Sequence, residues 1–94
     1  MNYTKTTLKK VETLLEELGY TIRYEKGNFQ SGYCVVEYRK MAVVNRFFDT
    51  EGRINTLLEI LANLEVQPDQ LTEKTAKFYK TIDSAATEDK SSPN

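Results

Sequence analysis

The sequence predicts an α+β domain in which a three-stranded antiparallel meander is covered by helices on one face, in the order α-β-β-β-α-α. Apolar residues recur at three- and four-residue spacing toward both ends of the chain, as they do on amphipathic helices. Between about residues 20 and 45, short segments with alternating or continuous apolar residues follow one another. The connections between these segments are too short to contain a helix, which favours antiparallel neighbours.

The first helix is predicted from an apolar stripe that ends at a glycine. Leu8, Val11, Leu15 and Leu18 lie three or four residues apart, and charged residues fill many of the positions between them. Gly19 is typical of the position just past the last residue of a helix.

Three strands are predicted after this helix. Residues 20–25 alternate between apolar and polar side chains, which indicates a half-buried strand, and residues 33–37 form the second strand. Residues 41–45 are apolar on both faces, so we expect the third strand to be more buried than the others. Residues 26–32 contain two glycines and are expected to form a hairpin turn, and residues 38–40 a tight connection.

Two further helices complete the predicted fold. Asp49 or Thr50 is suited to cap the second helix, with Glu51 in its first turn. Its apolar face is broad and consists of Ile54, Leu57, Leu58, Leu61 and Leu64. Pro68 is acceptable at the first position of a helix, so the third helix is expected to start there. We therefore divide the chain into a core domain (1–66), a C-terminal helix (67–86) and a flexible tail (87–94).

The composition limits the chemistry available to the protein. The 94 residues include no histidine and a single cysteine, Cys34, so neither a His-based nucleophile system nor a His/Cys-rich zinc site can be assembled. We expect Cys34 to be a buried packing residue, and we expect no enzymatic activity, metal or cofactor. The glycine-containing loop 27–32 lacks the Gly-Lys-Ser/Thr ending of a phosphate-binding loop.

Charge and hydropathy bear on location and partners. Thirteen basic and fourteen acidic residues leave a formal net charge of −1, so no general attraction to nucleic acid or an anionic membrane is expected. The polar N-terminal residues do not resemble a signal peptide, and no apolar run approaches the roughly 20 residues of a membrane span. Together with the single cysteine, these features predict a cytoplasmic protein.

The C-terminal helix carries a short heptad-like seam of Leu71, Thr75, Phe78, Ile82 and Ala85. This seam can fold back on the core of its own chain or pair with another chain. Because a small domain gains much from additional buried surface, we favour a homo-oligomer with contacts at Leu71, Phe78 and Ile82. The leading functional hypothesis is therefore a non-enzymatic protein-interaction module that self-associates and whose protein partner is unknown.

The alternative hypothesis is a weak binder of single-stranded nucleic acid. Aromatic residues are frequent in and around the predicted strands, and they could stack bases beside basic side chains. The contacts would come from Arg23, Tyr33, Arg39, Lys40 and Arg46. The balanced net charge instead favours a packing role for the aromatics.

Two resemblances to known proteins bear on these hypotheses. The stretches Tyr24–Glu37 and Val43–Phe48, with the helix start Glu51–Asn55, resemble a family of small bacterial proteins of Bacteroidetes type that has no assigned activity. The resemblance covers about residues 8–64 and implies a bacterial cytoplasmic protein. The segment from Arg53 is also similar to the one that leads into the HExxH helix of small zinc peptidases. Aligned on Glu59, however, Leu58 and Ala62 occupy the positions of both zinc-binding histidines.

Overall fold

The computed structural model describes residues 2–26 and 33–91; the side chains of residues 33, 37, 68 and 83–91 lie outside this description. The predicted order of elements, α-β-β-β-α-α, is confirmed. The helices are α1 (Lys5–Glu17), α2 (Thr50–Ala62) and α3 (Glu73–Ser91), and the strands are β1 (Thr21–Glu25), β2 (Tyr33–Val36) and β3 (Met41–Asn45). Two 3₁₀ turns, Glu37–Arg39 and Pro68–Gln70, connect elements.

The sheet is mixed, so the prediction of an antiparallel meander was wrong. The strand order is β1-β3-β2: β2 and β3 are antiparallel neighbours, whereas β1 runs parallel to β3 on its other side. The physical reason lies in β3, whose sequence is apolar on both faces. Four of its five residues are apolar, and a central strand is more enclosed by its neighbours than an edge strand, so β3 lies between β1 and β2.

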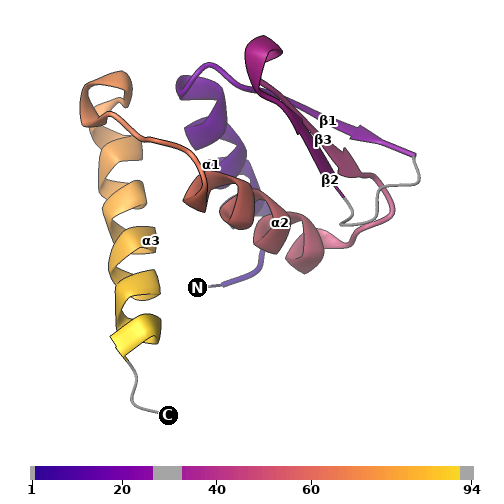
Figure 1. Ribbon diagram of the computed structural model, residues 1–94. Helices are drawn as coiled ribbons and strands as arrows, with labels where there is room; N and C mark the ends of the chain where they lie inside the picture. Colours follow the sequence, from indigo (N-terminus) through magenta and orange to yellow (C-terminus); the bar gives the residue numbers. More distant parts are fainter. Residues whose placement is uncertain (1, 27–32, 92–94) are drawn as a thin grey trace.

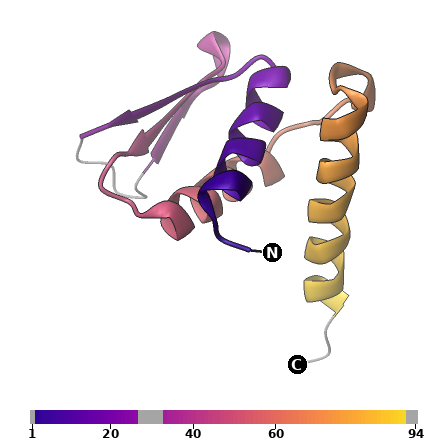
Figure 2. The ribbon, with the colours of Figure 1, turned by 180° about the vertical axis from the view of Figure 1, so that it is seen from behind.

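In the described part of the chain, two helices cover one face of the sheet and leave the other uncovered (Figures 1 and 2). On β3, Ala42 and Val44 are fully buried toward the helices, while Met41, Val43 and Asn45 point to the opposite face and remain partly exposed. The buried apolar residues are these two strand residues together with Val11, Leu14, Leu15, Leu18, Ile54, Leu57, Ile60 and Leu61. The core is thus built by α1, β3 and α2. Leu14 and Ile60 belong to it although the predicted stripes omit them, whereas Leu8, Leu58 and Leu64 are only partly buried. We call the uncovered side the open face of the sheet.

Helix α1 ends as its sequence predicts. Gly19 has φ +94°, a left-handed conformation that favours glycine. Its N–H donates to the carbonyl of Glu16, and the N–H of Tyr20 donates to the carbonyl of Leu15. This pair of hydrogen bonds is a Schellman motif, which turns the chain from α1 directly into β1.

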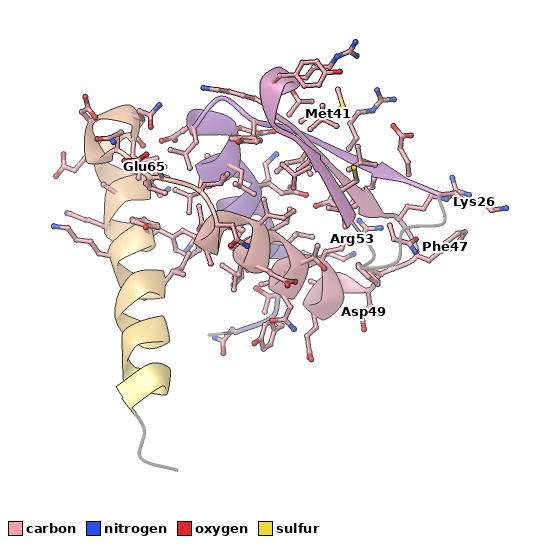
Figure 3. The ribbon with its side chains drawn as sticks, viewed as in Figure 1. Lys26, Met41, Phe47, Asp49, Arg53 and Glu65 are labelled. Atoms are coloured by element: carbon pink, nitrogen blue, oxygen red, sulfur yellow. The ribbon has the colours of Figure 1, made fainter. Side chains whose placement is uncertain are left out.

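Arg53 fixes the connection between β3 and α2. Asp49 caps α2 by accepting a hydrogen bond from the Gly52 N–H at 2.8 Å. The Arg53 side chain donates to two carbonyls of the same connection, from Nε to Phe48 at 3.0 Å and from Nη2 to Arg46 at 2.8 Å. Figure 3 shows Arg53 and Asp49 at this end of the sheet, with Met41 at the opposite end.

The third helix begins at Glu73 rather than at Pro68. Pro68 instead starts a 3₁₀ turn, where its missing N–H is equally harmless. Thr72 then caps α3, because its carbonyl accepts from the Ala76 N–H and its hydroxyl from the Thr75 N–H. The helix continues to Ser91 and so includes residues 87–91, which the sequence had assigned to a tail. Within the described residues, no helix is both long and apolar enough to cross a membrane.

Candidate functional site

One carboxylate of α1 accepts hydrogen bonds from the start of α3. Glu17 accepts a hydrogen bond from the Thr72 N–H at 2.9 Å, another from the Thr75 hydroxyl at 2.8 Å and a third from the Thr72 hydroxyl at 3.3 Å. The bond from the Thr72 N–H is the main reason why the pKa of Glu17 lies below its ordinary value of 4.5. The last turn of α1 therefore holds the first turn of α3, and the two helices run antiparallel (Figure 2).

A groove of about 1370 Å³ lies between these two helices. One wall comes from the residues before and within α1, from Asn2 to Thr13, and the other from the start of α3, from Thr72 to Thr81. We call it the basic groove, because five lysines line it: Lys5, Lys9, Lys10, Lys74 and Lys77. Glu73 is the single acidic residue among the described residues of its lining.

The electrostatic character of the basic groove differs from that of the whole chain. Five lysines against one glutamate give its lining a formal surplus of four positive charges, whereas the chain as a whole carries −1. Among the described side chains, the ion pair recorded in the groove is the exposed Lys77–Glu73 pair at 3.7 Å. Such a pair contributes little, so the groove remains a locally positive surface.

The groove also has an apolar component. Phe78 is partly buried in its lining, and the Lys10 ammonium lies 5.8 Å from the centroid of the Phe78 ring. Most of the remaining polar lining residues are threonines, which carry a methyl group beside the hydroxyl. Because lysine side chains also expose long methylene stems, the lining combines apolar surface with positive charge.

The residues of the predicted self-association seam pack within their own chain. Leu71, Phe78 and Ile82 are partly buried against the hydrophobic core, together with Tyr79. Thr75, which lies on the same seam, is buried and donates to Glu17. Leu71, Phe78 and Ile82 therefore help to attach α3 to the domain, while Phe78 also lines the basic groove.

The residues proposed for nucleic-acid contact are distributed over the sheet rather than brought together. Arg23 lies on the open face and pairs with Glu25 at 2.6 Å. Arg39 and Lys40 precede β3, whereas Arg46 follows it. The backbone of Tyr33 belongs to β2, but its side chain is outside the described part of the chain.

The aromatic side chains do not form a continuous stacking surface in the described part of the sheet. Tyr24 packs toward the helices, where its hydroxyl donates to Glu12. Tyr38 and Phe47 are 85% and 66% exposed, but they lie beyond opposite ends of β3. A strand of that length spans about 16 Å, so the two rings cannot stack neighbouring bases.

Cys34 is not the buried packing residue that the sequence predicts. It is exposed on the open face, opposite Val43 of β3, rather than buried in the core. The predicted loop at residues 27–32 lies outside the described residues. In the part of the chain that is described, no three His, Cys, Asp or Glu side chains come close enough to hold a metal ion.

The basic groove was not predicted from the sequence, although a signal for it exists. Basic residues before residue 11 and between residues 74 and 80 are all lysines, whereas arginines predominate between them. Each lysine cluster resembles the hydrated side of an amphipathic helix when it is considered alone. The groove follows from the antiparallel packing of two helices that are distant in sequence.

Comparisons with known proteins add no assignment: no family model, curated protein or solved structure matches the chain.

Proposed function

We propose that this protein is a non-enzymatic protein-interaction module whose basic groove binds an acidic amphipathic helix of a partner protein. The observation that carries the proposal is that five lysines and Phe78 line one groove between two antiparallel helices. No reaction chemistry is required of the site, since positive charge beside apolar surface suffices for recognition.

The dimensions of the groove suit a helix. The stretch of α1 from Lys5 to Thr13 rises about 12 Å along its axis, and the facing stretch of α3 is of similar length. A partner helix of two to three turns, lying between α1 and α3, would contact both walls along this length. Its apolar side chains would meet Phe78 and the lysine stems, and its acidic side chains would meet the ammonium groups.

Nucleic acid is the competing ligand, because lysines and threonine hydroxyls also contact phosphates. Single-stranded nucleic acid, however, gains much of its affinity by stacking bases on several aromatic rings. Phe78 is the one aromatic residue in the described lining, and Lys10 already lies over its ring. These features favour a polypeptide over a nucleic-acid strand.

Fluorescence anisotropy with three labelled probes tests the proposal. The probes are an acidic peptide of about three helical turns with leucines on one face, a scrambled peptide of the same composition, and an oligothymidylate of equal charge. We expect the amphipathic peptide to bind roughly tenfold more tightly than the other two, and more weakly as salt is added.

Charge-reversal variants locate the binding site. Lys9→Glu and Lys74→Glu lie on opposite walls of the groove, and each is expected to weaken peptide binding roughly tenfold. Lys26→Glu makes the same charge change at the end of β1, away from α3, and is expected to have little effect (Figure 3). Equal binding of the oligothymidylate, or equal loss in all three variants, would contradict the proposal.

A further inference from the structure

The backbone of β1 is hydrogen-bonded on one side only in the described structure. Toward β3, the Thr21 N–H donates to the Lys40 carbonyl at 2.8 Å, and the Glu25 carbonyl accepts from the Arg46 N–H at 3.1 Å. Because alternate residues of a strand face the same neighbour, Ile22 and Tyr24 direct their N–H and C=O groups away from β3. Among the described residues, no partner is recorded for these outward groups.

The charged side chains of this edge are complementary to themselves. Arg23 and Glu25 both lie on the open face, form an ion pair at 2.6 Å and keep 57% and 43% of their side chains exposed. If a second copy of β1 lies antiparallel to the first and Tyr24 faces Tyr24, then each Arg23 lies opposite a Glu25 of the other copy. We propose that the protein forms this symmetric dimer, which joins two sheets into one of six strands.

The hydrogen-bonding pattern agrees with this register. Tyr24 directs its N–H and C=O outward, so the central pair exchanges two backbone hydrogen bonds across the two-fold axis. Arg23 and Glu25 then occupy non-hydrogen-bonded positions, where facing side chains approach most closely, with Cα atoms about 4.5 Å apart. Each cross-strand pair brings opposite charges together, which is the stabilising arrangement.

The edge also lacks the usual protection against such pairing. Edge strands are commonly blocked by proline, by a bulge or by charges that repel a second copy. β1 contains no proline, pairs with β3 in unbroken register and carries one charge of each sign on its open face. In both ribbon views β1 forms the outer rim of the sheet, with no helix drawn beyond it (Figures 1 and 2).

Sedimentation velocity over a concentration series tests the dimer through a charge exchange. We expect Arg23→Glu and Glu25→Arg each to weaken dimerisation roughly tenfold or more, because either change places four like charges together. The double variant Arg23→Glu/Glu25→Arg restores alternating charges and is expected to dimerise within about threefold of the wild type. Arg46→Glu, an equal charge change outside β1, is the matched control, and circular dichroism checks that every variant is folded.

Hydrogen exchange provides a second measurement on the same edge. The amides of Ile22 and Tyr24 should be protected at concentrations that favour the dimer and should exchange quickly in Arg23→Glu. A wild-type protein that stays monomeric at millimolar concentration would overturn the proposal, and so would a double exchange that fails to restore the dimer. The third contrary outcome is a dimer that persists in the Arg23 and Glu25 variants but dissociates in Val43→Glu. The two copies would then meet through the open face, and the edge pairing would be wrong.

Discussion

Arg53 makes three contacts that join α1, β1 and α2 through one chain of side chains. Its guanidinium bonds the carbonyls of Arg46 and Phe48 and lies 4.3 Å from the centroid of the Tyr24 ring. The Tyr24 hydroxyl in turn donates to Glu12 on α1 at 2.5 Å. Burial, together with this hydrogen bond, raises the pKa of the Tyr24 phenol above its ordinary value, so Tyr24 remains a neutral donor at physiological pH.

This geometry predicts the effect of a conservative substitution. Arg53→Lys keeps the charge but loses the planar fork that reaches two carbonyls and stacks on a ring. We expect the free energy of unfolding to fall by about 1.5–3 kcal/mol, the range for hydrogen bonds to a charged group. Urea denaturation followed by circular dichroism measures it, with Arg46→Lys as the control. Equal midpoints for both variants would contradict the role assigned to Arg53.

At the scale of elements, local patterns predicted which segments form helices and strands, but not how the strands pair. The alternation in β1 has the same period whether its neighbour is β2 or β3, so the sequence allowed a meander. The signal that decides between them is the apolar character of Met41–Asn45, which suits a central strand. Cys34 was misplaced for a related reason: a cysteine in an apolar strand gives no indication of which face it occupies or whether a helix covers that face.

The attachment of α3 should depend on pH through Glu17. Hydrogen bonds favour the ionised form and lower the pKa of this carboxyl below 4.5 in the folded protein. The ionised carboxylate therefore stabilises the attachment fully at pH values above the pKa of Glu17 in the unfolded chain. This stabilisation is lost as the pH falls through the lower pKa of the folded protein. We expect the Thr72 amide resonance to report this loss below pH 4.5. The Glu17→Gln variant, which cannot titrate, should lack the transition, and an unchanged transition in that variant would assign it to another group.

At the scale of the whole molecule, the two proposed surfaces lie on different sides of the sheet. The basic groove is formed by α1 and α3, and α1 packs against the covered face. Arg23 and Glu25 point to the open face, with the sheet between them and α1. The groove could not be predicted from either helix alone, because its walls meet through the contact of Glu17 with Thr72 and Thr75, and these residues are far apart in sequence.

This separation predicts that the two surfaces act independently. Effects at distant sites that share no partners usually add. Arg23→Glu should therefore weaken dimerisation roughly tenfold or more and leave the affinity for the acidic peptide within about twofold of the wild type. Lys9→Glu should weaken peptide binding roughly tenfold and leave dimerisation unchanged. Sedimentation velocity and anisotropy on the same preparations measure both properties. If either single substitution removes both, then peptide and second copy share one surface, and the division of the molecule into a groove and a pairing edge is wrong.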